Sequence, residues 1–315
     1  MLDFRMPIRR FDRCTAARAF TFLELIIALA IVGLILASVI PFIMSKREMS
    51  RRAECAFNLA RIRDAMNAYA GDNNGNYPRV RAEEPAAFTG WRAFTGADDA
   101  NPFAQSSKVE TNDVTAALWL LVRGGYITDT SYFVCPSSGD WQDRLYDSNG
   151  KIVPANRRGN FRQPGNLSYS MFCPYSAVPD FKWVDTLKPE CPILADKNPG
   201  VGNGSDVTKP NADAAIEAFA AANSLNHGRA IQNVLYADGS VQPEANPYVG
   251  DGYVRPYTDP SGKYHPAQSG DNLYTALREK PLAPGEHATA DTNGVFSKTA
   301  GPAWQGDAFL VPAAN

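Results

Sequence analysis

The feature that most constrains this 315-residue chain is an uncharged apolar run of 20 residues from Leu25 to Met44. A helix of that length spans about 30 Å, the hydrocarbon thickness of a bilayer, because each residue adds about 1.5 Å. A helix buried in a soluble core is the alternative, but such helices are rarely so long and uninterrupted. The run therefore predicts a membrane-spanning helix. Pro41 lies inside it and predicts a local kink, because proline removes a main-chain donor.

The residues on either side of the run indicate its orientation. The first 19 residues carry five arginines against two aspartates, a net charge of +3, whereas residues 45–54 carry a net charge of +2. This small difference favours a cytoplasmic N-terminus. A secretory signal has its small-residue cleavage site after the apolar run, but the small-residue site here, Ala19, precedes it. Cleavage after Ala19 would keep the helix in the mature chain, and an uncleaved anchor is the alternative.

Glu24 is an acidic residue one position before the apolar run. A carboxylate at that depth in a membrane is costly unless it finds a partner. Cleavage after Ala19 would free the α-amino group of Phe20 and make Glu24 the fifth residue of the mature chain. The amine of an incoming subunit could then neutralise Glu24 of its neighbour and set the axial register, because a buried charge without a partner is strongly disfavoured. The alternative is that Glu24 reaches the membrane surface and has no role.

The segment RAFTFLELIIALAIVGLILASVIP resembles the N-terminal segment of type IV pilins and type II secretion pseudopilins, although Ala19 stands where these proteins usually have glycine. The resemblance implies that a membrane prepilin peptidase cuts between Ala19 and Phe20 and methylates the Phe20 amine. It also implies a single-pass protein of the inner membrane with a periplasmic C-terminal domain. Such a subunit would join a periplasmic or surface filament through contacts with other subunits, lipid and the inner-membrane assembly machinery.

The helix is expected to continue beyond the membrane. Cys55, Leu59, Ile62, Met66 and Tyr69 recur at spacings of 4, 3, 4 and 3 and form one apolar stripe. Such a stripe indicates packing on a globular domain. The turn-forming sequence that starts at Gly71 then ends the helix. The chain thus divides into a leader (1–19), a membrane helix (20–44), its amphipathic continuation (45–71), a globular domain (72–246) and a loop-rich C-terminal extension (247–315).

The globular part is expected to be an α+β domain with a pilin-like layout, in which the long helix packs on a small antiparallel sheet with long loops. A hairpin is expected where Asp238-Gly239 favours a primed two-residue turn. Short helices are predicted at Thr115–Arg123 and Ala212–Ala222. Strands are predicted at Tyr132–Cys135, Leu167–Phe172, Pro192–Ala195, Asn233–Ala237 and Ser240–Gln242.

A second, longer resemblance covers elements such as YFVCPSS, PILADKNP and LNHGRAIQNVLYADGSV. These are similar to a group of large bacterial prepilin-type proteins with a His…Asp-Gly element, here His227 and Asp238-Gly239. His227, Asp238 and Asp196 could meet at one end of the sheet as a metal or ligand site. Two or three candidate ligands do not define a metal site, however, so we interpret these residues as hydrogen-bonded loop anchors and predict no bound metal.

The four cysteines after the leader, Cys55, Cys135, Cys173 and Cys191, have spacings that fit neither a zinc site nor a CxxC redox motif. An even number suits an oxidising compartment and two disulfides, Cys173 with Cys191 and Cys55 with Cys135. Four buried free thiols are the alternative.

No catalytic motif is visible, so the sequence predicts a non-enzymatic protein without a cofactor. Calcium is the one ligand considered, at Asp72–Gly75 or in the oxygen-rich loop from Asp196 to Asp206, although neither has EF-hand spacing. A net charge of −2 gives no reason to expect nucleic-acid binding. Three functions follow: a filament subunit, which the sequence favours; a membrane-tethered binding module that does not polymerise; and a periplasmic enzyme.

Overall fold

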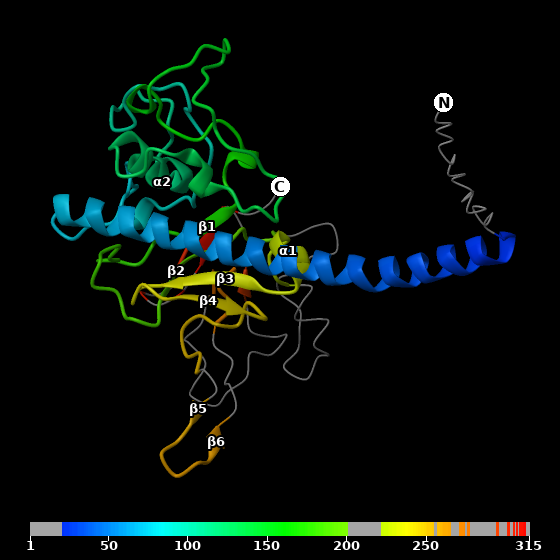
Figure 1. Ribbon diagram of the computed structural model, residues 1–315. Coiled ribbons are helices and arrows are strands. Elements are labelled where there is room, and N and C mark those ends of the chain that lie inside the picture. The colour runs from blue at the N-terminus through cyan, green and yellow to red at the C-terminus, as the bar shows by residue number, and fades with distance from the viewer. Residues whose placement is uncertain are drawn as a thin grey trace, which may run out of the picture. The chain divides into compact units, whose positions relative to one another are not determined.

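The computed structural model describes residues 21–200, 222–254, 257–265, 271–274, 276–277, 294–295, 301–302, 305, 307 and 309–312. The predicted cleavage site Ala19–Phe20 lies outside this set, as does the predicted helix from Ala212 except for its last residue. The chain forms two compact units, Met1–Arg47 and Glu48–Asn315. The long helix α1, Phe22–Asp72, belongs to both units (Figure 1).

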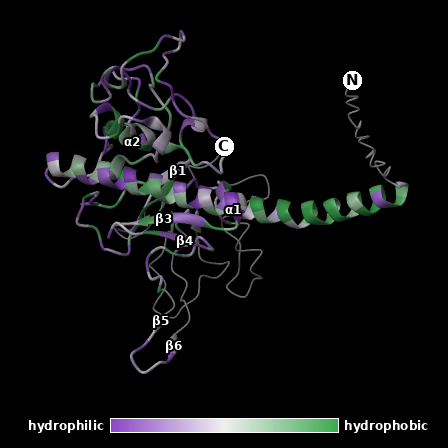
Figure 2. Cartoon of the chain, in the orientation of Figure 1, coloured by the Kyte–Doolittle hydropathy of each residue, from purple (hydrophilic) through white to green (hydrophobic). Residues whose placement is uncertain are grey.

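In the first unit, α1 is apolar and exposed on all sides. Every residue from 21 to 47 is solvent-exposed, and the segment is predominantly hydrophobic (Figure 2). Within the described part of the chain, α1 is the one helix long and apolar enough to cross a membrane, and it could be an anchor or a signal sequence. The helix continues through Pro41, so the predicted kink does not interrupt it.

In the second unit, α1 buries the predicted stripe. Cys55, Leu59, Ile62 and Met66 are fully buried, and Tyr69 packs partly buried against the same core. The helix ends at Asp72, and the turn after it contains two left-handed residues, Asn74 with a φ of +56° and Gly75 with a φ of +78°. The Gly75 N–H donates to the carbonyl of Ala70 at 2.8 Å and closes the helix end. The amphipathic continuation of the helix is therefore confirmed.

The core sheet is antiparallel, with strand order β4-β3-β2-β1-β9 (Figure 1). With the long helix, it confirms the predicted α+β layout. The predicted strands near 167–172 and 192–195 and the hairpin are present. The strands are β1 (Tyr169–Phe172), β2 (Pro192–Asp196), β3 (Gln232–Tyr236), β4 (Val241–Glu244) and β9 (Leu310–Val311).

Part of the predicted C-terminal extension belongs to this core. Strand β9 pairs with β1 through Met171↔Val311 and Phe172↔Leu310. Earlier in the extension, Tyr274 is fully buried in the same core. Two smaller ribbons also occur in this region: β5 (Tyr257–Thr258) with β6 (Tyr264–His265), and β7 (Ala276–Leu277) with β8 (Gly294–Val295).

Helix α2, Val114–Arg123, confirms the predicted short helix. The predicted strand at Tyr132–Cys135 is wrong. Residues Thr130–Phe133 form a short 3₁₀ helix, η2, because the Asp129 side chain accepts a hydrogen bond from the Ser131 N–H at 2.9 Å and caps the turn. Further 3₁₀ turns are η1 (Pro85–Ala87), η3 (Ala155–Arg157), η4 (Pro164–Asn166) and η5 (Asn226–Arg229).

Candidate functional site

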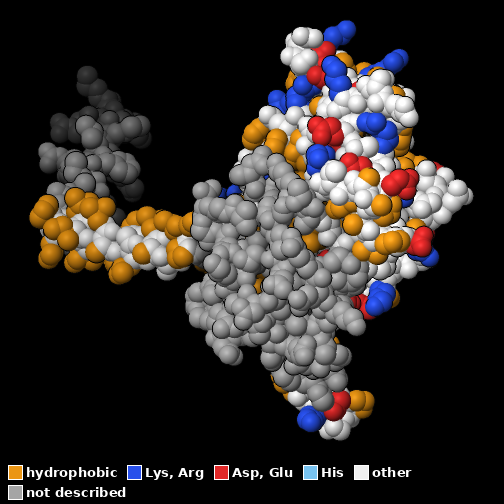
Figure 3. All heavy atoms as spheres, turned by 180° about the vertical axis from the view of Figure 1, so that it is seen from behind, with side chains coloured by type: hydrophobic (Ala, Val, Ile, Leu, Met, Phe, Trp, Pro, Cys, Tyr) orange, Lys and Arg blue, Asp and Glu red, His pale blue; other side chains and the backbone are white. Residues whose placement is uncertain are grey.

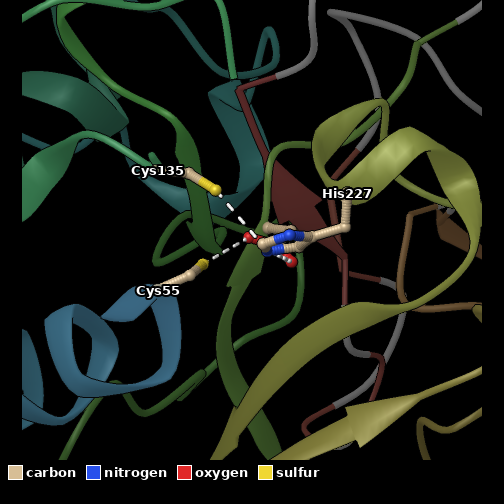
Figure 4. A group of neighbouring side chains, drawn as sticks. Cys55, Cys135 and His227 are labelled. Atoms are coloured by element: carbon tan, nitrogen blue, oxygen red, sulfur yellow. Dashed lines mark hydrogen bonds and ion pairs between the residues drawn. The ribbon is translucent and has the colours of Figure 1, made fainter. Parts of the chain in front are cut away.

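Two thiols, a carboxylate and an imidazole meet in the interior of the second unit (Figure 4). They belong to Cys55, Cys135, Asp196 and His227, which we call the Cys-Asp-His cluster. One sulfur, oxygen or ring nitrogen of each residue lies within 4.8 Å of those of the other three. All four residues are buried. They come from four separate segments of the chain, so the tertiary fold creates the cluster.

Each member is placed by a specific local structure. Cys55 lies on the buried stripe of α1, and Cys135 follows η2. Asp196 is the last residue of β2 and is completely buried. His227 sits in η5 with a left-handed backbone, at a φ of +56°, and Gly228 beside it has a φ of +62°. This turn brings the imidazole to the end of the sheet where β2 finishes and β3 begins.

Three close contacts link the four side chains of the cluster in a row, from Cys55 through Asp196 and His227 to Cys135. The Cys55 thiol donates to Asp196 Oδ1 at 3.0 Å, and Cys135 Sγ lies 3.5 Å from His227 Nε2. His227 Nε2 is also 3.6 Å from Asp196 Oδ2. The ring nitrogen Nε2 therefore faces both a sulfur and a carboxylate oxygen.

The other ring nitrogen is held by Glu48. His227 Nδ1 lies 2.7 Å from Glu48 Oε1, and the Ser137 hydroxyl donates to the same carboxylate at 2.9 and 3.0 Å. A carboxylate accepts hydrogen bonds, so Nδ1 carries the hydrogen, and in a neutral ring the lone pair of Nε2 points into the cluster. The Asn233 amide also approaches Nε2, at 3.3 Å.

Asp196 is held in place by two further donors. The Asn226 side-chain amide donates to Oδ1 at 3.0 Å, and the main-chain N–H of Asn233 donates to Oδ2 at 2.7 Å. Because burial disfavours a negative charge, the pKa of Asp196 is raised, although the charge of His227 and these hydrogen bonds act to lower it. The carboxylate is thus fixed in orientation, with the imidazole of His227 as its charged neighbour.

The two thiols differ in acidity. Burial raises the pKa of Cys55 well above its usual value. The pKa of Cys135 is lowered to about 7, because the hydrogen bond with Cys55 and the contact with His227 stabilise its thiolate. Burial opposes protonation of His227, but the Cys135 contact and the charge of Asp196 raise the pKa of this histidine to about 9. The cluster can therefore share protons, or place thiolate, imidazole and carboxylate donors around a cation.

Of the three residues considered as a possible site, two come together. His227 meets Asp196, but Asp238 follows β3, at the opposite end of the strand from His227. The Asp238 carboxylate caps its own turn by accepting from the Ser240 N–H at 2.8 Å. The carbonyl of Gly239 accepts from Arg63 of α1 at 2.6 Å. Asp238-Gly239 is therefore a loop anchor, as the hydrogen-bonded interpretation expected.

The Asp238-Gly239 turn differs from the primed two-residue turn predicted. The N–H of Gly239 donates to the Tyr236 carbonyl at 2.9 Å, and of the two turn residues Gly239 alone has a positive φ, +86°. The loop thus has three residues, with glycine in the left-handed position. The reason is that the Asp238 side chain satisfies the Ser240 N–H locally.

We expect Gly239→Ala to lower the free energy of unfolding by about 1–2 kcal/mol, because alanine is strained in the left-handed region. The matched control is Gly71→Ala, near the end of α1, where an added Cβ meets nothing within 4 Å. That change should raise stability by about 0.5–1 kcal/mol, because alanine has the higher helix propensity. Urea unfolding measures both changes, and equal effects from the two variants would contradict this role for Gly239.

The predicted disulfides are not formed in the structure, where all four described cysteines are free and buried. Cys173 and Cys191 each donate to a main-chain carbonyl, of Tyr175 and Pro192 respectively. Burial raises the pKa of both thiols to about 12, so they stay protonated. Cys55 and Cys135 do come together, as predicted, but within the Cys-Asp-His cluster.

The two segments considered for calcium have other contacts. In the turn after α1, Asp72 accepts from the Tyr126 hydroxyl at 2.8 Å, and the Asn73 amide donates to the Tyr69 carbonyl at 2.7 Å. In the second segment, Asp196 belongs to the Cys-Asp-His cluster, and residues 201–206 lie outside the described part. These contacts do not test whether calcium binds at either place.

Glu24 forms the first turn of α1 with Thr21. The main-chain N–H and the hydroxyl of Thr21 each donate to Glu24 Oε2 at 2.9 Å, and the Glu24 N–H donates back to the Thr21 hydroxyl at 3.2 Å. This reciprocal pattern is a capping box. It holds the carboxylate at the helix start, where the helix dipole favours a negative charge.

The Cys-Asp-His cluster is not visible in the sequence as a unit. The sequence does indicate its two halves separately, Cys55 with Cys135 as a disulfide pair and Asp196 with His227 as a possible site. The role of Glu48 had no sequence signal, because it depends on a side chain 179 residues away. No known family model matches the chain, and no curated protein or solved structure matches it either.

Proposed function

We propose that this chain is a pilin-like structural subunit, anchored in a membrane by the first part of α1 and assembled into a filament through that same segment. The observation that carries the proposal is the exposed apolar surface from Phe22 to Met44, with Glu24 as its acidic residue. The resemblance of this segment to type IV pilins and type II secretion pseudopilins agrees with it.

The exposed segment needs a non-aqueous environment. Hydrophobic side chains lie along the length of this segment in Figure 3. Among them, Phe22 and Leu34 are 78% and 73% exposed. Exposed apolar surface costs roughly 25 cal/mol per Å² relative to burial. Lipid supplies the environment for a single chain, and packing against the same segment of other copies supplies it in a filament.

Glu24 gives such packing a specific register. Its carboxylate is exposed and bonded only locally to Thr21 in the contacts described above. In a filament the free amine of Phe20 on a neighbouring copy would be a partner of opposite charge, which a buried carboxylate requires. The proposal therefore includes removal of residues 1–19 by a prepilin peptidase and methylation of the new N-terminus.

The second unit then serves as the exposed head of the subunit, on the periplasmic side. All four members of the Cys-Asp-His cluster are buried, which supports a structural protein rather than an enzyme. The alternative is a tethered binding module that never polymerises; it predicts that changes at Glu24 leave its activity intact.

The first test is the mass of the mature N-terminus. We expect chains isolated from membranes of cells with an active prepilin peptidase to begin at Phe20 and to carry one methyl group. The matched control is the same chain from cells lacking the peptidase, which should begin with the leader. A chain that keeps its leader in both strains would contradict the proposal.

A further inference from the structure

We propose that the Cys-Asp-His cluster binds one zinc ion, with Cys55, Cys135, Asp196 and His227 as its four ligands. The site would be structural and would tie α1 to the sheet. This proposal concerns only the second unit and holds whether or not the chain forms filaments.

The geometry of the cluster fits a tetrahedral ion. Zinc bonds of about 2.3 Å to sulfur and about 2.0–2.2 Å to nitrogen or oxygen place the ligand atoms roughly 3.3–3.8 Å apart. The cluster has Cys135 Sγ to His227 Nε2 at 3.5 Å and His227 Nε2 to Asp196 Oδ2 at 3.6 Å. Cys55 Sγ and Asp196 Oδ1, at 3.0 Å, are closer because they share a hydrogen. On binding of the ion, each of the two thiols releases its proton to solvent, and the Cys55 sulfur and the Asp196 oxygen can then separate around the ion.

The donor set selects the class of metal. Two thiolates, an imidazole and a carboxylate suit zinc, whereas calcium and magnesium prefer oxygen ligands throughout. Four protein ligands leave no open coordination position, which is the arrangement of structural rather than catalytic zinc sites. A divalent cation would also compensate the buried negative charge of Asp196, which is otherwise costly.

Residues around the cluster hold the proposed ligands in place by hydrogen bonds. Glu48 holds His227 Nδ1 at 2.7 Å and so directs the lone pair of Nε2 inward, the carboxylate–histidine arrangement common in zinc sites. The Asn226 amide and the Asn233 N–H orient the Asp196 carboxylate. Asn233 also approaches His227 Nε2, so its amide would have to give way to the ion.

The competing chemistry is a disulfide between Cys55 and Cys135. Two adjacent thiols in an oxidising compartment tend to form one, and a bound ion would protect them. A disulfide would leave Asp196 and His227 as an ion pair without a metal. The two outcomes differ in metal content and in the oxidation state of the two sulfurs, so one preparation distinguishes them.

The test is the zinc content of the full chain, purified in detergent without chelators and measured by inductively coupled plasma mass spectrometry. We expect one zinc per chain in the unmodified protein and in Cys173→Ser and Cys191→Ser, which remove equally buried thiols outside the cluster. Cys55→Ser and Cys135→Ser should lose the zinc. Glu48→Gln should keep the site but weaken zinc affinity by about 10–100-fold, because Glu48 acts through His227.

A second measurement needs no variant and therefore does not depend on altered chains folding. After replacement of the metal by cobalt, the unmodified chain should show the visible absorption of tetrahedral Co²⁺ and a near-ultraviolet thiolate charge-transfer band. A chain without stoichiometric zinc that gives no such spectrum would overturn the proposal. So would a Cys55–Cys135 disulfide in protein isolated under non-reducing conditions with its thiols blocked at lysis.

Discussion

A chain carrying Glu24→Ala is expected to insert in the membrane and fold normally but to form no filament. The change removes the acidic group beside the apolar segment, and the amine of a neighbouring subunit then has no partner of opposite charge in the packed interface. Sedimentation of sheared filaments and their counting by electron microscopy measure the effect. Glu24→Gln should give the same loss, because the charge rather than the size of the side chain is needed.

The matched control is Glu54→Ala, an exposed glutamate on the same helix but outside the apolar segment. It should leave filament yield unchanged, and both variants should reach the membrane in equal amounts. If Glu24→Ala assembles as well as the control, the paired-charge account of assembly is wrong. The tethered-module alternative would then be favoured.

Asp143→Ala is expected to lower the free energy of unfolding by about 3–5 kcal/mol, because it strands a buried guanidinium. Arg158 Nη1 and Nη2 donate to the two oxygens of Asp143 at 2.6 and 2.7 Å. The side chains are 0% and 3% exposed, respectively. Arg158 also lies over the ring of Trp119, with its guanidinium carbon 4.8 Å from the ring centroid. Without Asp143, the Arg158 guanidinium would be a buried positive charge with neither a carboxylate partner nor contact with solvent.

The matched control is Glu110→Ala, which breaks the Arg92–Glu110 ion pair, where the side chains are 36% and 57% exposed. That change should cost no more than about 1 kcal/mol, because water and salt screen an exposed pair. The double variant Asp143→Ala/Arg158→Met should recover part of the lost stability, since it removes the stranded charge. Similar urea midpoints for Asp143→Ala and Glu110→Ala would show that the buried ion pair contributes no more to the free energy of unfolding than the exposed one.

The parts of the fold that could be predicted are those with a local signal. The apolar run and the 3–4 spacing from Cys55 to Tyr69 predicted one continuous helix, which runs from Phe22 to Asp72 in the structure. The segments 167–172 and 192–195, predicted as strands, correspond to β1 and β2, and the Asp238-Gly239 turn residues predicted the β3–β4 hairpin.

Other parts depend on contacts that no local pattern encodes. The residues around Tyr132 have strand composition, but the Asp129 cap turns them into η2. Strand β9 has two residues and owes its existence to pairing with β1, far away in the sequence. Short strands of this kind carry too few residues to show a periodic pattern.

The Cys-Asp-His cluster illustrates the same limit for a site. Cys55 and Asp196 are 141 residues apart, and Cys135 and His227 are 92 residues apart. Zinc sites found from sequence have closely spaced ligand pairs, and this cluster has none. The residue types were visible in the sequence, but their convergence follows from the packing of α1 on the sheet.

The pairing of β9 with β1 makes completion of the domain a late event in synthesis. The edge formed by Met171 and Phe172 stays open until residues 310 and 311 have been translated. A nonsense mutation after the β3–β4 hairpin but before residue 310 leaves that edge free to pair with another polypeptide. Prematurely terminated products should therefore aggregate or be degraded, and an affinity tag joined directly after residue 311 would disturb folding more than one inserted at the exposed tip of the β5–β6 ribbon.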